Sequence, residues 1–378
     1  MVSQPEKKLV YVLNYVHQND VQHFVHVMGL LNALKARGWS IVLLSEKGGS
    51  GTATVLGQEV RYLSQSSKLL RFVRLLANLI GLRAQGYRLV FVRISKLPAL
   101  IAAVLGKFIG MKVVYWQSGT NRDLDQTKPL NRRIVENVQM KSLITAVNRF
   151  VTGPETMLDY YEREYGVPRR KLLLLYNDID ITRFPTVERV RKEGDPIRIL
   201  FVHSFSPSKN VILYLPQMID RLNRAAQAGA KIVFDLAGDG PERKEVEAIV
   251  AKAGPGVTVR LLGAVRNTSL PQHYAEADIF VMPSYREGMP RALMEAMSSG
   301  LPAVSTDAGG TRDLVGPLQD GFVVSRDDPE KFADCLYTLV VDPELRRAMG
   351  TENLQSIRRF STDVVADMYD DRLSSLLR

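Results

Sequence analysis

Glu287 and Glu295 lie eight positions apart in the stretch REGMPRALMEAMSSG, residues 286–300. Pro290 suits the first position of a helix, because its missing N–H would have no partner there. Gly300 suits the other end, since glycine enters the left-handed region without strain. The spacing therefore predicts Glu287 in a loop and Glu295 in the second turn of a helix that ends just before the glycine.

The start of this helix is predicted to bind an anion. The backbone N–H groups of Gly288, Met289 and Arg291 would point out of it, and the positive end of the helix dipole favours a phosphate. Two carboxylates beside a phosphate suit a ligand that also carries hydroxyls, because a carboxylate accepts two hydrogen bonds. A nucleotide sugar has both groups. The alternative is a pair of solvent-facing glutamates on an ordinary amphipathic helix.

The rest of the sequence must fold so that such residues meet. Both halves of the chain alternate strand-like apolar runs with helical stretches, the pattern of parallel sheets covered by helices. At 378 residues the chain exceeds the size at which one core keeps growing, and the polar stretch 184–196 is a candidate linker. We therefore predict two α/β domains, 1–190 and 191–360, that face one another across a cleft at the carboxyl ends of their strands.

The charge is unevenly divided between the two halves. The net charge is +10, but residues 1–190 hold 27 basic and 14 acidic side chains, whereas residues 191–378 hold 23 and 26. This asymmetry favours an anionic partner for the first half, with plain solubility charge as the alternative. Nucleic acid is not expected as that partner, because the aromatic residues, 8% of the chain, are not interleaved with the basic ones.

Other classes of site are excluded by composition. The single cysteine, Cys335, rules out a disulfide framework and a cysteine-clustered metal site, and it suits a reducing cytoplasm. The five histidines have no zinc-like spacing. No apolar run reaches the ~20 residues that a spanning helix needs, and the short run near Met1 does not resemble a signal peptide. The sequence predicts no metal site and a cytoplasmic protein.

One basic stretch, residues 68–83, has the pattern of an amphipathic helix. Lys68, Arg71, Arg74 and Asn78 fall on one side of a helical wheel, and leucines, Phe72 and other apolar side chains cover the other. A basic face beside a wide apolar face suits a helix in an anionic membrane interface. It equally suits a surface helix packed on its own sheet.

The second half carries a further set of motifs in a fixed order. ILFVHSFSPSKN, DLAGDGPER, VRLLGAV, YREGMPRALMEA and the glycines Gly309 and Gly310 resemble the retaining, nucleotide-sugar-dependent glycosyltransferases of family 4, whose E-x7-E motif matches the pair of glutamates. The resemblance is specific across residues 197–325. It implies a GT-B fold of two Rossmann-like domains, with a last helix, 361–378, that crosses back to the first domain.

The resemblance also implies roles for single residues on the donor side. Glu295 matches the glutamate that holds the donor ribose, and Glu287 the one near the donor sugar and the reaction centre. Lys209 matches a lysine on the donor phosphates, and Arg266 a position that contacts the base. Gly288, Met289 and Arg291 match the pyrophosphate cradle.

Three departures from the family pattern affect the rest of the site. His203 and Ser204 stand where the family has Gly-Arg, so either another group supplies one phosphate cation or the donor is bound in a different geometry. Both residues are kept as donor-binding candidates. The first strand is followed by NYVHQNDVQ instead of a Gly-Gly loop, with His17 and Asn19 as acceptor-side candidates. Gln117 and Ser118 replace a histidine near the sugar, and they complete the candidate set for the acceptor side of the cleft.

The sequence thus predicts a retaining glycosyltransferase. It would move a hexose-type sugar from a nucleoside diphosphate sugar to a glycan or lipid-linked acceptor, without a metal or other cofactor, in bacterial surface polysaccharide or glycolipid synthesis. The basic first domain is expected to touch the inner membrane face. Two alternatives stay open: a non-catalytic subunit that binds a nucleotide sugar or acts as a scaffold, and another GT-B enzyme such as a nucleotide-sugar epimerase or a phosphorylase.

Overall fold

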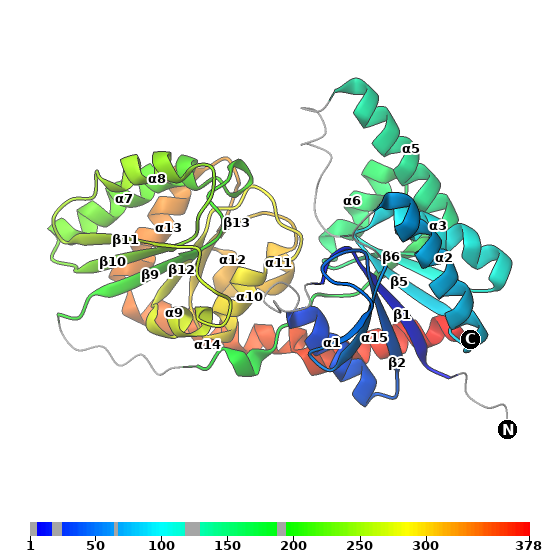
Figure 1. Cartoon of the computed structure of the whole chain (residues 1–378). Coiled ribbons are helices and arrows are strands. Elements are labelled where there is room, and N and C mark those ends of the chain that lie inside the picture. Colours follow the sequence, from blue (N-terminus) through cyan, green and yellow to red (C-terminus); the bar gives the residue numbers. More distant parts are fainter. Residues whose placement is uncertain (1–5, 17–24, 64–66, 118–128, 187–193) are drawn as a thin grey trace. The chain divides into compact units, whose positions relative to one another are not determined.

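The computed structural model describes residues 6–16, 25–63, 67–117, 129–186 and 194–378 (Figure 1). The chain divides into two compact units, one made of Met1–Asp178 with Thr362–Arg378 and the other of Ile179–Ser361.

The first unit ends before the limit predicted at residue 190. Residues from Ile179 onward pack on the second unit, because Arg183 donates from Nη2 to the Asn267 side chain at 2.7 Å and Phe184 meets the Tyr274 ring edge-on. The polar stretch chosen as the linker therefore begins after the chain has already joined its second domain.

The first unit is built on an eight-stranded sheet in the order β3-β4-β2-β1-β5-β6-β7-β8. All neighbours are parallel except the hairpin of β3 and β4. The central strands are apolar except at their ends, as expected where helices cover both faces. The strands are β1 (Lys8–Leu13), β2 (Ser40–Ser45), β3 (Thr52–Val55), β4 (Gln58–Tyr62), β5 (Leu89–Arg93), β6 (Lys112–Trp116), β7 (Arg149–Thr152) and β8 (Leu172–Leu174).

Helices cover the two faces of this sheet with two separate cores. One core includes α1 and the C-terminal helix α15, and the other includes α2, α3, α5 and α6. α2 is packed through Leu75, Leu79 and Leu82, so it does lie on its own sheet. The helices are α1 (Val25–Ala36), α2 (Lys68–Ala84), α3 (Lys96–Ile109), α5 (Leu130–Ala146), α6 (Thr156–Tyr165) and α15 (Thr362–Leu377), with a short 3₁₀ turn at Arg169–Lys171. The 3₁₀ turn at Ile181–Arg183 belongs to the second unit.

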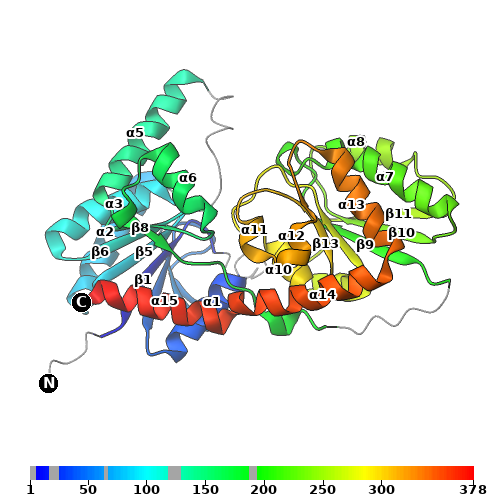
Figure 2. The same cartoon turned by 180° about the vertical axis from the view of Figure 1, so that it is seen from behind.

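The last helix belongs to the first unit although it follows the second in sequence. α15 packs along α1 (Figure 2). Its Asp370 carboxylate accepts from Lys7 Nζ at 2.7 Å and from Trp39 Nε1 at 2.8 Å, and Asp367 accepts from Arg37 Nε at 2.7 Å. These ion pairs and the buried Tyr369 fix the helix to the sheet on which the chain began.

The second unit has six parallel strands in the order β11-β10-β9-β12-β13-β14. They fall within the strand-like runs of this half of the sequence: β9 (Ile197–Val202), β10 (Ile232–Ala237), β11 (Val257–Gly263), β12 (Ile279–Met282), β13 (Ala303–Thr306) and β14 (Val323–Val324). The helices between and after them are α7 (Val211–Gln227), α8 (Arg243–Val250), α9 (Leu270–Glu276), α10 (Arg291–Ser298), α11 (Thr311–Leu314), α12 (Pro317–Asp320), α13 (Pro329–Val341) and α14 (Pro343–Ile357), with 3₁₀ turns at Pro207–Lys209 and Arg358–Phe360.

Within the described residues, no helix is both long enough and apolar enough to cross a membrane.

Candidate active site

The topology of the second unit marks one place for a ligand. The first strand, β9, lies beside the fourth, β12, so the chain runs outward in opposite directions from this pair. Open parallel sheets bind ligands at the carboxyl ends of such neighbouring strands. The segments that leave these two strand ends are 203–210 and 283–290, and they hold most of the predicted donor residues.

The segment after β9 is held by backbone and hydroxyl contacts. His203 N–H donates to Ala237 O at 3.1 Å, which extends the sheet by one residue. The hydroxyls of Ser204, Ser206 and Ser208 then follow one another at 3.2 and 3.3 Å. The Ser208 carbonyl accepts from Tyr285 N at 3.0 Å and so joins this segment to the one after β12.

Glu287, Lys209 and His203 meet at this junction. Lys209 Nζ donates to Glu287 Oε1 at 2.9 Å, and His203 Nε2 lies 3.3 Å from the same oxygen. The Ser204 N–H donates to His203 Nδ1 at 2.9 Å, which leaves Nε2 as the nitrogen that carries the proton toward the carboxylate. Only 11% of the Glu287 side chain and 14% of the Lys209 side chain are exposed. Three predicted residues are therefore brought together.

Glu287 is held in its ionised form. Burial alone would raise its pKa, but the hydrogen bond from His203 and the charge of Lys209 outweigh burial and lower the pKa to about 2. A carboxylate of this kind cannot donate a proton at neutral pH. It can accept hydrogen bonds from hydroxyls and stabilise positive charge.

The lowered pKa of Glu287 predicts a stability effect confined to acid pH. The interactions of the carboxylate stabilise the fold fully above its ordinary pKa of 4.5 and are lost as the pH falls toward about 2. The whole effect is about 3 kcal/mol. We expect the difference in thermal midpoint between the wild-type chain and Glu287→Gln to be constant from pH 5 to 7 and to shrink at lower pH. Calorimetry across that range is the measurement, and a difference that grows on acidification contradicts the assignment.

Lys209 keeps a donor for a ligand. Its ammonium group has three N–H donors, and it uses two, toward Glu287 Oε1 at 2.9 Å and toward the Arg286 carbonyl at 3.2 Å. Within the described residues no third acceptor is bound by this group. A phosphate oxygen can be bound there without breaking the pair with Glu287.

The helix at the second glutamate begins one residue later than predicted. Pro290 is the N-cap of α10 instead of its first helical residue, and the first helical bond runs from Met294 N to Pro290 O at 3.1 Å. The amides of Arg291, Ala292 and Leu293 precede that bond and form the anion-binding end of the helix. Gly288 and the buried Met289 lie in the preceding loop. The far end matches the prediction, with Gly300 at φ +71°.

Glu295 lies in the second turn of α10, as predicted, but it is buried. Its Oε2 accepts from the Tyr274 hydroxyl of α9 at 3.0 Å. Burial raises the pKa of Glu295, although Arg291, the Tyr274 hydroxyl and Arg183 act in the opposite direction. The alternative of a solvent-facing glutamate is wrong, since only 7% of the residue is exposed.

A buried carboxylate whose pKa is raised costs stability at neutral pH. Because the folded state binds the proton more tightly than the unfolded state, stability falls as pH rises through the folded pKa. We expect Glu295→Gln to keep or raise the thermal midpoint at pH 7. If the carboxylate holds a ribose, the same variant weakens nucleotide binding about 10- to 100-fold, as the loss of charged hydrogen bonds does. A lower midpoint with unchanged nucleotide affinity assigns Glu295 to structure alone.

Glycines allow the loops of this site to approach closely. A Cβ on Gly309, which has φ +57°, would lie 2.3 Å from the Glu287 carbonyl oxygen. Gly310 N–H donates to Gly288 O at 2.7 Å. A Cβ on Gly238 would lie 1.9 Å from the His203 carbonyl oxygen. Neighbouring strands thus brace both segments through backbone that admits no side chain.

The remaining predicted residues lie elsewhere or outside the described residues. Arg266 is exposed in the turn before α9, where its carbonyl accepts from Ser269 N at 2.9 Å. Gln117 follows β6, is buried, and accepts from the Tyr115 hydroxyl at 2.8 Å. The others, His17, Asn19 and Ser118, lie outside the described residues.

Two contributors to the site carry no sequence signal. Tyr274 supports Glu295 from a helix that begins with an unremarkable LPQHYAE. The Arg286 carbonyl, a backbone group, receives Lys209. The serine at every second position from 204 to 208 is a visible pattern, but only the fold shows that the three hydroxyls face one another.

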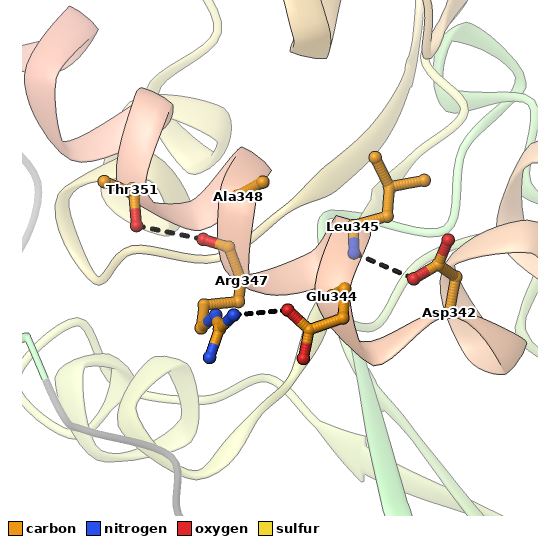
Figure 3. Close-up of a pocket in the computed structure, with 6 residues that line it drawn as sticks. All are labelled: Asp342, Glu344, Leu345, Arg347, Ala348 and Thr351. Carbon is orange, nitrogen blue, oxygen red and sulfur yellow. Dashed lines mark hydrogen bonds and ion pairs between the residues drawn. The ribbon is translucent and has the colours of Figure 1, made fainter.

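A second hollow of this unit, of about 600 Å³, lies along α14 (Figure 3). Its charged groups are already engaged locally: Asp342 accepts from Leu345 N at 2.9 Å, and Arg347 pairs with Glu344. It is lined by none of the predicted donor residues. We assign it no role in the chemistry.

A comparison with known families bears directly on this geometry. Residues 183–355 match the family model described as Glycosyl transferases group 1. The matched region includes both strand-end segments, α10 and both glutamates. This part of the chain is therefore similar to the group 1 glycosyltransferases.

Relatives of the chain act in different syntheses. N-acetyl-alpha-D-glucosaminyl L-malate synthase of Bacillus anthracis is 27% identical over 75% of this chain and 73% of that protein. Sulfoquinovosyl transferase of Arabidopsis thaliana is 35% identical over 44% of this chain and 32% of that protein. A D-inositol 3-phosphate glycosyltransferase of Streptomyces bingchenggensis is 23% identical over 67% of this chain. The last two alignments span 32% and 58% of those relatives.

Solved structures show the fold of the whole chain. Sucrose-phosphate synthase of Thermosynechococcus elongatus superimposes with a TM-score of 0.74 at 17% identity, over 98% of this chain and 99% of that chain. HepE of Anabaena in complex with UDP also gives 0.74, at 16% identity, over 97% and 100%. The predicted GT-B fold is confirmed.

Proposed function

We propose that this chain transfers a hexose-type sugar from a nucleoside diphosphate sugar to an acceptor hydroxyl, with retention at the anomeric carbon, as a member of glycosyltransferase family 4. The observation that carries the proposal is the pairing of Lys209 with Glu287 at the switch between β9 and β12, beside the start of α10. It combines a cation and helix amides for a diphosphate with an ionised carboxylate for a sugar. HepE, of the same fold, has been solved with UDP-glucose.

The chemistry divides among these groups. The acceptor oxygen bonds to the anomeric carbon as the bond from that carbon to the diphosphate oxygen breaks. Lys209 and the amides that open α10 stabilise the charge that develops on the leaving diphosphate. The acceptor proton passes to a leaving phosphate oxygen, since Glu287 and Lys209 are already paired. Glu287, ionised, accepts from sugar hydroxyls and stabilises positive charge at the anomeric carbon.

The substrate-binding experiment is direct. The purified chain is titrated with UDP-, GDP- and ADP-sugars, and binding is measured by calorimetry. We expect at least one donor to bind and the matching nucleoside diphosphate to compete with it. Binding of a nucleotide sugar without any turnover of it on membrane extract supports the non-catalytic alternative. A chain that binds no donor contradicts the proposal.

We also propose that transfer needs no divalent metal. The Lys209 ammonium and the start of α10 supply positive charge at the site. We expect EDTA to leave the initial rate unchanged within about twofold. Removing a metal that the reaction needs would cause a far larger loss, because such a metal stabilises the transition state by several kcal/mol. A rate that falls after chelation and returns with Mg²⁺ contradicts this part of the proposal.

The setting that we propose is the cytoplasmic face of a bacterial membrane, in surface polysaccharide or glycolipid synthesis. The described surface of the first unit supports it. α2, α3 and α5 expose apolar side chains that include Leu69, Phe108 and Val138. These helices carry nine lysines and arginines against one acidic residue, Glu136. Apolar side chains among cations suit an anionic bilayer interface.

A further inference from the structure

The first unit contains a cavity of about 420 Å³ that the donor chemistry does not use. It lies where β1, β2 and β5 end, beside the first turns of α2 and α3. β1 and β5 are neighbours in the sheet although they are not consecutive in sequence, so this is the switch point of the first sheet. Its position is the one at which an open parallel sheet binds a ligand.

The charged lining of the cavity is mostly positive. Lys47, Lys68 and Arg71 line it together with a single carboxylate, that of Glu46. Among the described residues, none of the three cations is paired with an acidic side chain. Cations without partners at a cavity wall indicate an anionic ligand.

The positions of the cations at helix starts lower the stability of the helices that carry them. Lys68 and Arg71 lie in the first turn of α2, Lys96 opens α3, and neither first turn holds an acidic residue. Positive side chains are unfavourable at the positive end of a helix dipole. A bound anion removes that disadvantage, so the arrangement is explained by a ligand better than by folding.

The rest of the lining is apolar and continues onto the surface. Phe72, Leu97 and Ile101 line the cavity, and 60% of Leu97 is exposed. Outside the cavity, Leu69 of α2 is 73% exposed and Phe108 of α3 is 84% exposed. A small free anion does not need an apolar surface. A lipid with an anionic headgroup needs cations for the headgroup and an apolar surface for its hydrocarbon chain.

We propose that this cavity binds the headgroup of the acceptor and that the acceptor is a phosphorylated lipid. Its phosphate lies beside Lys47, Lys68 and Arg71, and its hydrocarbon chain covers the exposed apolar side chains of α2 and α3. This inference rests on the proposed glycosyl transfer, for which it names the acceptor class. The cavity belongs wholly to the first unit.

The test compares two anionic lipids at the same surface charge. Phosphatidylcholine vesicles contain either phosphatidic acid, a phosphate monoester, or phosphatidylglycerol, at fractions that give equal electrophoretic mobility. Sedimentation of the full chain with each vesicle measures the partition coefficient. We expect a severalfold preference for phosphatidic acid, because a general attraction to negative charge cannot distinguish vesicles of matched charge.

Two double variants of equal charge separate the cavity from the surface. Lys68→Ser with Arg71→Ser removes two cavity cations, and Lys107→Ser with Lys141→Ser removes two exposed cations from α3 and α5. We expect both to weaken total binding by roughly tenfold or more, but only the cavity variant to lose the preference for phosphatidic acid. The proposal is overturned if the wild-type chain shows no preference or if the cavity variant keeps it.

Two further measurements distinguish a lipid from free phosphate as the ligand, and this inference from the proposed transfer. If inorganic phosphate at millimolar concentration displaces the chain from phosphatidic acid vesicles completely, the site takes free phosphate and the lipid assignment is wrong. Donor titration without vesicles is run on the same preparations, with equal affinities expected for the wild-type chain and the cavity variant. A chain that binds donor but shows no lipid preference refutes only this inference. A chain that prefers phosphatidic acid but binds no donor refutes the proposed transfer, and the cavity is then a lipid site without an acceptor role.

Discussion

Glu287→Gln lowers turnover by about 10²- to 10³-fold, the usual loss when one preorganised electrostatic contact to a transition state is removed. The amide keeps the size of the side chain and an oxygen for Lys209, so the fold is preserved. What it lacks is the full negative charge that Lys209 and the hydrogen bond from His203 keep in place at neutral pH. Initial rates with the donor found by titration measure the effect, and kcat falls while donor affinity changes little.

A matched variant controls for the charge change itself. Glu276→Gln removes one carboxylate from the exposed end of α9 in the same domain, and its rate remains near that of the wild-type chain. If Glu287→Gln retains more than about a tenth of the wild-type kcat, Glu287 only orders Lys209, because removing a charged contact at the reacting carbon costs more activity than that.

Local sequence predicts the strands of the second sheet, though not their order, because short strand-like runs are local signals. Five of the six strands are short and bury at least half of their residues, whereas the edge strand β11 buries only Val257. The first sheet was harder to predict. Its hairpin of β3 and β4 turns through Leu56 and Gly57, both at positive φ, and leucine gives no hint of such a turn.

Contacts from elsewhere in the chain hold that turn. Asn32 Nδ2 donates to the Leu56 carbonyl at 3.1 Å and Lys35 Nζ to the Gly57 carbonyl at 2.8 Å. Both come from α1, more than twenty residues earlier. A strained local conformation that is stabilised by distant side chains cannot be read from its own sequence.

The candidate site also combines features that local sequence predicts with contacts that it does not predict. The loop and helix positions of the two glutamates follow from proline, glycine and spacing, which are local. That Lys209 pairs with Glu287 depends on β9 lying next to β12, a long-range fact. So does the position of His203, which directs a proton toward Glu287 where the family has glycine. With Ser204 in place of that arginine, the proposed phosphate position relies on Lys209, which is held there by Glu287.

Lys209→Met consequently weakens nucleoside diphosphate binding and lowers turnover, each by about 10²-fold or more. Methionine keeps the length of the side chain but removes its charge and its three donors. Because the leaving diphosphate gains charge as its bond to the sugar breaks, the loss in kcat/KM exceeds the loss in ground-state affinity. Calorimetry with the nucleoside diphosphate and initial rates with the donor measure the two effects separately.

The affinities for nucleoside and nucleoside diphosphate distinguish the role of Lys209 from that of Glu287. Lys209→Met weakens binding of the nucleoside diphosphate much more than binding of the nucleoside. Glu287→Gln leaves both affinities near those of the wild-type chain. Lys244→Met, which removes an exposed lysine from α8, controls for surface charge and alters neither. The double variant of Lys209 and Glu287 loses less than the product of the two single losses, since paired groups act as one unit. Equal weakening of nucleoside and nucleoside diphosphate by Lys209→Met places Lys209 away from the phosphates and refutes the assignment.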